Sequence, residues 1–132
     1  MLAAPTAAQV PTGVDATARA APGTPQRRAI LDALRSAVEA RLGPRVEFVV
    51  SEIRVRQGWA LVVAEPQRRG GARIDGRQYF PGQWEEMDGL TTSAVLRFSE
   101  GRWILVDHAI GATDVWYCGG ILPAAVAPGF GC

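Results

Sequence analysis

The chain has no lysine, only one histidine and no long run of apolar residues. All 14 basic side chains among its 132 residues are arginine, and 13 acidic residues reduce the net charge to +1. Such a balance lacks the positive excess of nucleic-acid-binding surfaces. No apolar run approaches the roughly 18–20 residues that cross a bilayer. We therefore expect neither a nucleic-acid partner nor a membrane span.

The N-terminal residues also lack a complete secretion signal. Residues 1–10 have no basic start and no long apolar segment, although MLAAPTAAQ resembles the remnant of a trimmed export signal. Residues 1–23 are mostly Ala, Pro, Thr and Gly, which bury too little apolar surface to offset the entropy lost on ordering. We predict a disordered tail over 1–23 and a single domain over 24–132.

Cysteine is scarce, and both copies lie near the C-terminus. A disulfide between Cys118 and Cys132 would close a Gly- and Pro-rich loop and stabilise the fold by about 3 kcal/mol. Such bonds belong to oxidising compartments, and the alternative is two separate thiols in a reducing cytosol. No histidine is near enough in sequence to complete a zinc site, and we expect no metal and no cofactor. The exclusive use of arginine with much Ala, Gly and Pro is typical of a GC-rich bacterial genome. These features predict a periplasmic or secreted bacterial protein.

Residues 25–42 carry the pattern of an amphipathic helix. Thr24 is the predicted N-cap, Pro25 occupies the first helical position, and Gly43 ends the helix. One stripe at helical spacing is apolar and comprises Ile30, Leu31, Leu34, Val38 and Leu42. The helix is therefore expected to pack one face on an apolar surface.

Apolar residues of period two then predict four strands in two hairpins. Residues 45–64 alternate with a phase slip at Ser51 and Glu52, which indicates a bulge, and turn at Gln57 and Gly58. Residues 90–110 turn at Glu100 and Gly101. The expected fold is α+β, with one long N-terminal helix packed on a curved four-stranded antiparallel sheet.

The second hairpin supplies the candidates for catalysis. If Ser99 faces Arg102, then Phe98 faces Trp103 on the buried side, and simple alternation places Asp107 inward and His108 outward. A buried Asp107 could act as an acid or base, or it could cap a backbone amide or pair with an arginine. His108 is the second catalytic candidate, but adjacent strand residues point to opposite faces, so a surface or structural role is the alternative.

The connection over residues 65–89 is the least regular part of the chain. Its turn-forming residues alternate with Tyr79, Phe80 and Trp84, which favours an ordered loop that folds over the sheet. Together with Trp59, these three aromatic residues are the predicted contacts for a ligand or partner.

Two stretches resemble a known superfold. VRQGWALVVA (residues 55–64) and GRWILVDHAIG (residues 101–111), in a helix-then-curved-sheet order, resemble the cystatin-like superfold, which includes the NTF2-like domains. Residues 25–116 are also similar to small exported bacterial proteins of unknown function. The resemblance implies a fold and no activity.

Three functions remain compatible with these residues. The first is an exported, non-enzymatic binding or accessory domain for an unknown protein or small-molecule ligand, present as a monomer or weak dimer. The second is a small NTF2-like enzyme that uses Asp107. The third is an inhibitor or immunity-type module that binds proteins through exposed loops.

Overall fold

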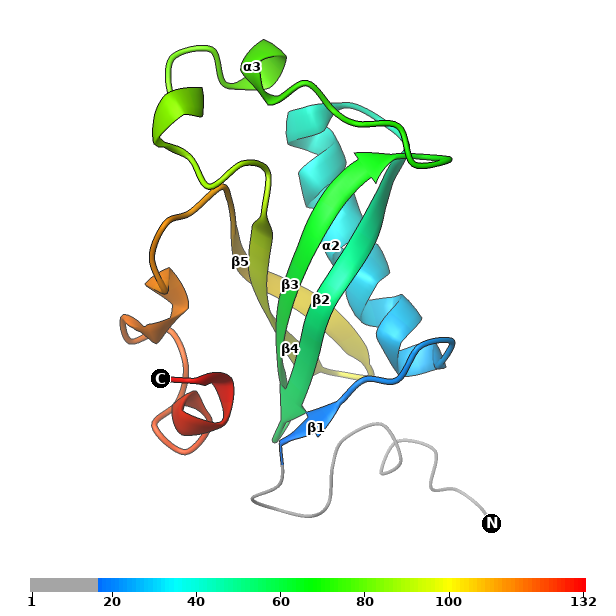
Figure 1. Ribbon diagram of the computed structural model, residues 1–132. Coiled ribbons are helices and arrows are strands. Elements are labelled where there is room, and N and C mark those ends of the chain that lie inside the picture. The colour runs from blue at the N-terminus through cyan, green and yellow to red at the C-terminus, as the bar shows by residue number, and fades with distance from the viewer. Residues whose placement is uncertain (1–16) are drawn as a thin grey trace.

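The protein consists of one long helix that lies across an antiparallel sheet (Figure 1). The computed structural model describes residues 17–132. Its five strands, in the sheet order β1-β2-β3-β4-β5, are Ala18–Arg19 (β1), Val46–Arg56 (β2), Trp59–Arg68 (β3), Thr92–Ser99 (β4) and Arg102–Ile110 (β5). The helices are Pro25–Leu42 (α2) and Gly76–Tyr79 (α3), with 3₁₀ turns at Trp84–Glu86 (η1), Trp116–Cys118 (η2) and Ala127–Phe130 (η3). The predicted α+β class and the long helix are confirmed.

Helix α2 begins and ends at the predicted residues. The Arg27 backbone N–H donates to Thr24 Oγ1 at 3.2 Å, and Pro25 occupies the first turn. At the other end Gly43 takes a φ of 86°, which glycine adopts without steric cost, and its N–H donates to the Glu39 carbonyl. The helix buries Ile30, Leu34, Val38 and Leu42 against the sheet. Each such side chain contributes about 1.5–3 kcal/mol when fully buried.

The two hairpins turn where the sequence predicts. Gln57 and Gly58 have φ angles of 50° and 80°, and Glu100 and Gly101 have 53° and 84°. Two successive positive φ angles twist the turn in the same sense as the strands, which suits a two-residue hairpin. The predicted irregularity in β2 is also present, between Val50 and Glu52.

The sheet has a fifth strand that the sequence analysis does not predict. Ala18 and Arg19, inside the predicted disordered tail, pair with Val55 and Arg54 of β2. Ala20 follows as a buried residue. Two residues are too short for a periodic pattern, so composition alone misassigns residues 17–23. The expectations for residues 1–16, including the signal remnant, lie outside the described residues.

The register of the second hairpin is correct only near its turn. Phe98 pairs with Trp103 as predicted, but the pairing then shifts, so that Val95 faces Asp107. The predicted positions of Asp107 and His108 are therefore wrong: Asp107 lies on the outer face, and His108 lies on the helix side opposite Ala94. A bulge in β5 between Leu105 and Asp107 causes this inversion, and it avoids the cost of burying an unpaired carboxylate.

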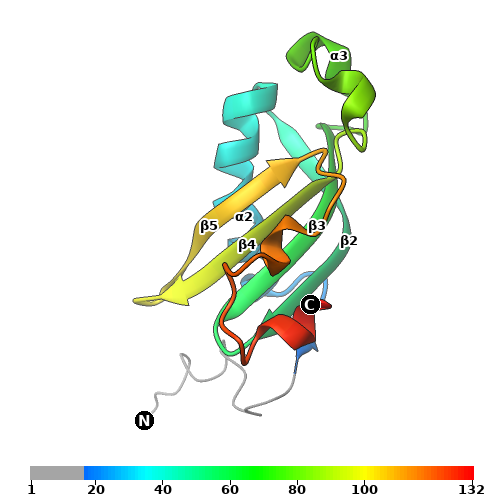
Figure 2. The same ribbon diagram turned by 90° about the vertical axis from the view of Figure 1, so that its left-hand side faces the viewer.

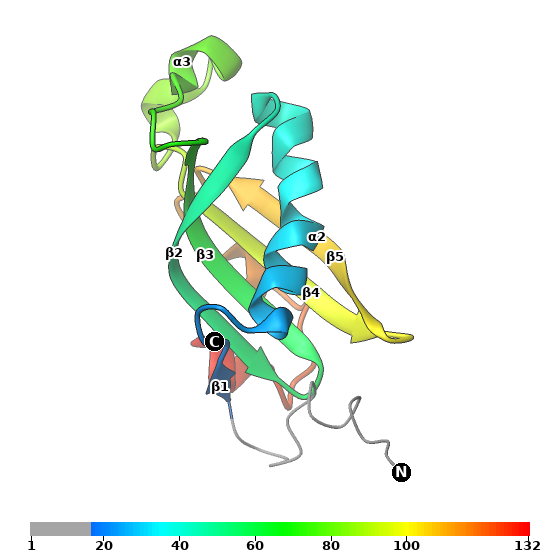
Figure 3. The same cartoon turned by 90° about the vertical axis from the view of Figure 1, so that its right-hand side faces the viewer.

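Part of the face of the sheet away from α2 is covered by residues 115–132, which we call the C-terminal strap (Figures 2 and 3). The strap buries Leu61 and Val95 beneath a cluster of three side chains, Leu122, Val126 and Phe130. Arg54 and Arg56 of β2 fix it in place by donating to the backbone carbonyls of Gly129 (3.3 Å) and Ala125 (2.9 Å). The sheet therefore separates two apolar clusters, one under α2 and one under the strap.

Candidate binding cleft

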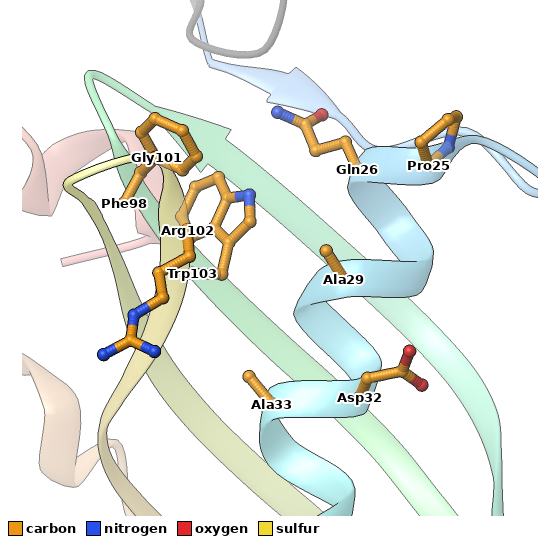
Figure 4. Close-up of a pocket in the computed structure, with 9 residues that line it drawn as sticks. All are labelled: Pro25, Gln26, Ala29, Asp32, Ala33, Phe98, Gly101, Arg102 and Trp103. Carbon is orange, nitrogen blue, oxygen red and sulfur yellow. The ribbon is translucent and has the colours of Figure 1, made fainter. Parts of the chain in front are cut away.

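A cleft lies between the first half of α2 and the end of the β4–β5 hairpin (Figure 4). Its volume is about 490 Å³, within the range of roughly 300–1,000 Å³ that small-molecule sites occupy. The helix contributes Pro25, Gln26, Ala29, Asp32 and Ala33. The hairpin contributes Phe98, Gly101, Arg102 and Trp103.

The helix wall of the cleft is shallow because its side chains are small. Pro25, Ala29 and Ala33 recur every fourth residue, a spacing that places them along one stripe of a helix. The stripe lies beside the buried line that begins at Ile30 and continues through Leu34. The larger side chains thus hold the helix on the sheet, while the small ones leave space next to the hairpin.

The hairpin wall is aromatic and contains an unusual polar atom. Phe98 and Trp103 are paired across β4 and β5, with ring centroids 5.3 Å apart and an interplanar angle of 61°. Trp103 is only 7% exposed, and its buried Nε1–H has no hydrogen-bond partner among the described residues. In Figure 4 this nitrogen faces the helix across the cleft. The nitrogen itself has almost no accessible surface, so a molecule in the cleft would contact the ring of Trp103 and not its N–H.

The charged side chains of the lining lie at its rim. Asp32 is exposed, forms an ion pair with Arg35 one turn along the helix, and points away from the hairpin in Figure 4. Arg102 is also exposed, and its guanidinium extends away from the indole. The interior next to the Trp103 ring is therefore bounded by apolar groups and by the Gln26 amide.

The two residues predicted for catalysis lie outside this cleft. Asp107 is exposed on the outer face, and its Oδ1 accepts a hydrogen bond of 2.8 Å from the His108 backbone N–H. His108 is half-buried, and this burial lowers the pKa of its imidazole. Asp107 opposes that shift in pKa, and Arg41 adds to it. The two side chains point to opposite faces of the sheet and do not form a catalytic pair.

Tyr79 and Phe80, predicted as ligand contacts, hold the 65–89 loop to the C-terminal end of α2. Phe80 is buried, with the Arg41 guanidinium carbon 4.9 Å from its ring centroid. The Tyr79 hydroxyl accepts a hydrogen bond of 2.8 Å from Arg68. Arg68 also donates to the carbonyl of Leu42, the last residue of α2, and to the carbonyls of Gly43 and Pro44, which follow it. Both aromatic residues therefore have structural contacts here.

The other two predicted contacts lie on separate surfaces. Trp84 borders a second cleft, of about 460 Å³, between the end of β3 and residues 73–90. Its indole packs so closely on Gly76 that a Cβ there would lie 2.0 Å from the ring. Trp59 packs against the cluster under the strap, with the Arg97 guanidinium carbon 5.9 Å from its ring centroid. The structure does not bring the four aromatic candidates to one site.

The predicted disulfide is present. Cys118 and Cys132 are bonded, with Cα atoms 5.4 Å apart, and the bond closes the strap into a loop. Within residues 17–132, no group of three or more His, Cys, Asp and Glu side chains is arranged to hold a metal ion. None of the helices in this same range is both long enough and apolar enough to cross a membrane.

Sequence reasoning assigns Trp103 to the core and so misses the cleft. The sequence feature that indicates the cleft is the line of small residues at Pro25, Ala29 and Ala33, on the helix expected to face this hairpin. Comparisons of the chain with models of protein families, with curated proteins and with solved structures give no match. Function must therefore be inferred from the geometry of the cleft.

Proposed function

We propose that this chain is a small, non-enzymatic domain that binds its ligand in the cleft between α2 and the β4–β5 hairpin. The observation that carries the proposal is the cleft itself, which has a volume of about 490 Å³ and an aromatic wall made by Phe98 and Trp103. Contact of an apolar ligand with these rings would remove apolar surface from water, which favours binding.

The proposal extends to the superfold. A long helix across a bent antiparallel sheet of consecutive hairpins supports membership in the cystatin-like superfold with its NTF2-like domains. The two stretches that carry the resemblance form the β2–β3 turn with the first part of β3, and the whole of β5. Helix α2 fills the concave face of the sheet, so ligand binding is assigned to the edge of that interface.

We also propose a periplasmic or secreted location in a bacterium. The bond between Cys118 and Cys132 supports an oxidising compartment, because cytosolic thiols are kept reduced.

The enzyme alternative has less support. Asp107, its proposed acid or base, is exposed on the outer face and does not line the cleft. That hypothesis requires a desolvated carboxylate beside a substrate cavity, whereas Asp107 pairs with Val95 and is exposed. Replacement of Asp107 by Asn is therefore expected to leave ligand binding unchanged.

One observation favours the inhibitor or immunity-type module as a second candidate. The turns at Gln57–Gly58 and Glu100–Gly101 project from the same end of the sheet, since Trp59 pairs with Arg97 close to both. Two adjacent exposed turns can contact a protein surface. Replacement of Gln57 and Glu100, neither of which lines the cleft, would abolish partner binding under this hypothesis and leave cleft binding intact.

The proposed function is tested by titrating the full ¹⁵N-labelled chain with small aromatic probes: acetophenone, ethylbenzene, benzoate and benzylammonium. At least one probe should shift the amide signals of Ala29 and Ala33 and the indole signal of Trp103. Ala29→Trp should block the cleft and abolish these shifts, because Ala29 lines it and is exposed. Ala40→Trp is the matched control, since Ala40 is exposed on the same helix outside the cleft lining. Shifts that are absent, or that survive in Ala29→Trp, would contradict the proposal.

A further inference from the structure

We infer that the ligand of this cleft is an extended peptide segment of a partner, which pairs with the free edge of β5, places an apolar side chain in the cleft and sets an acidic side chain beside Arg102. The inference rests on the proposed function and specifies the partner of the same site. It depends on the open edge of the sheet, on the backbone groups that face this edge and on the side chains that border it.

Strand β5 is an edge of the sheet, and no strand of residues 17–132 lies beyond it. It is last in the sheet order, and Figure 2 shows it as the free margin of the sheet. Ile104 and Val106 are 40% and 41% exposed, so the strap does not cover this margin. Edge strands are usually short, charged or covered, because their open N–H and C=O groups pair readily with another chain. A nine-residue edge with exposed apolar side chains therefore favours the addition of a partner strand.

The pairing of the hairpin shows which backbone groups face the open edge. The Phe98 N–H donates to the Gly58 carbonyl at 2.7 Å, so it points toward β3 and away from β5. Phe98 is opposite Trp103, and the residues of such an antiparallel pair direct their N–H and C=O groups away from each other. The N–H and C=O of Trp103, and by alternation those of Leu105, therefore face the edge. The bulge after Leu105 limits regular pairing to residues 102–105.

The cleft lies on the helix side of this edge. Alternation along β5 places Trp103 on that side, where its ring forms the wall opposite Ala29 and Ala33 (Figure 4). A strand added to β5 would carry one side chain beside Trp103, on the same face of the sheet. That side chain would enter the cleft between the indole ring and the small residues of α2. An apolar side chain, and an aromatic one in particular, fits these walls.

The outer side of the same stretch carries Arg102 and Ile104. Arg102 is exposed, and none of the ion pairs among residues 17–132 includes it. An acidic side chain opposite Arg102 would form a cross-strand pair of opposite charge, and a β-branched one opposite Ile104 would cover its exposed surface. A second copy of β5 has no acidic residue within 102–105, so self-pairing would leave Arg102 without an opposite charge. The edge therefore favours an acidic partner strand over a second copy of this chain.

The test uses the hexapeptide acetyl-Ser-Leu-Val-Phe-Glu-Ser-amide and the full oxidised, ¹⁵N-labelled chain. In antiparallel pairing, the Phe of the peptide lies opposite Trp103 and its Glu lies opposite Arg102. The backbone amide proton signals of Trp103 and Leu105 should move downfield, because both N–H groups gain a carbonyl acceptor. Ala29→Trp should block the position of the Phe ring and abolish binding, and Ala40→Trp should leave it unchanged.

N-methylation of the peptide separates strand pairing from contacts of side chains alone. The N–H of the peptide Phe faces the Trp103 carbonyl, whereas the N–H of the peptide Val faces away from β5. N-methylation of Phe should weaken binding by about tenfold, because one hydrogen bond is lost. N-methylation of Val is the matched control and should change the dissociation constant by less than about twofold. Equal affinities of the two N-methylated peptides would overturn the inference.

An exchange of charges connects the acidic preference to Arg102. Replacement of the peptide Glu by Lys should weaken binding by about fivefold. Arg102→Glu should reverse the order of the Glu and Lys peptides. Arg28→Glu changes the net charge by the same amount and is the matched control, because Arg28 is exposed on α2 outside the cleft lining. A native chain that prefers the Lys peptide, or an unchanged order in Arg102→Glu, would contradict the acidic partner.

Two further outcomes separate this inference from the proposed function. If the small aromatic probes bind in the cleft but the parent peptide causes no shifts up to about 2 mM, the peptide partner is refuted and the proposed function stands. Dimerisation of the chain through β5 that the peptide does not reverse would likewise refute the peptide partner. Absence of binding by both the peptide and the probes would refute the proposed function as well.

Discussion

Removal of the disulfide is expected to lower the free energy of unfolding by about 3 kcal/mol. The bond joins residues separated by 14 positions, and a cross-link of this loop length removes about that much chain entropy from the unfolded state. We expect the strap to keep its contacts without the bond, because Val126 and Phe130 pack on the sheet and Arg56 donates to the Ala125 carbonyl independently of the cysteines. The effect should therefore arise mainly in the unfolded chain.

The measurement is urea unfolding of Cys118→Ala/Cys132→Ala, followed by tryptophan fluorescence and compared with the oxidised native chain. A loss of about 3 kcal/mol corresponds to a fall in melting temperature of about 10 °C for a domain of this size. Reductant should destabilise the native chain to the same extent and should leave the double variant unchanged. A double variant within about 0.5 kcal/mol of the native chain would refute this reasoning, since the bond would then contribute almost nothing.

Three further outcomes follow from the packing and the charges. Leu34→Ala should cost about 2–5 kcal/mol in urea unfolding, because this side chain is fully buried, and a cost below 1 kcal/mol would contradict the α2 packing. Tyr79→Phe should cost about 0.5–1.5 kcal/mol through the lost hydrogen bond to Arg68, whereas no loss would mean that this bond does not hold the loop. Burial holds the pKa of His108 below its ordinary 6.5, so the unfolded chain binds the proton more readily and stability should fall as the pH drops below 6.5. Unfolding measured between pH 5 and 7.5 should show a shallower slope in His108→Gln, and an unchanged slope would contradict this assignment.

The sequence predicts the elements whose local chemistry is distinctive. Thr24, Pro25 and Gly43 mark the ends of α2, and a glycine marks each hairpin turn, because a positive φ there favours that residue. The two cysteines allow a single pairing, which the structure contains. In each case one or two residues are sufficient to determine the local geometry.

The missed features have weaker local signals. Trp103, Ile104, Leu105 and Val106 are all apolar, so alternation cannot show which of them faces the helix, and the bulge before Asp107 is invisible in the pattern. Burial of an unpaired carboxylate is unfavourable, and this is the feature of the sequence that argues against an inward Asp107.

The C-terminal strap and the cleft depend on contacts between distant segments. The Gly and Pro residues of Ala127–Phe130 show no helical pattern, so the sequence does not predict the short 3₁₀ turn there. The cleft requires the helix stripe and the Phe98–Trp103 pair to meet in space. A local sequence pattern does not show that these two distant segments come into contact.

The separation of the two apolar clusters by one sheet has a consequence for local opening. The strap lies on β3 and β4 through Leu61 and Val95, whereas α2 packs on the other side of the same strands. Partial unfolding that detaches the strap would leave the helix side intact. In amide hydrogen exchange, residues of the strap should therefore exchange through a low-energy opening, and those of α2 only through unfolding of the whole molecule.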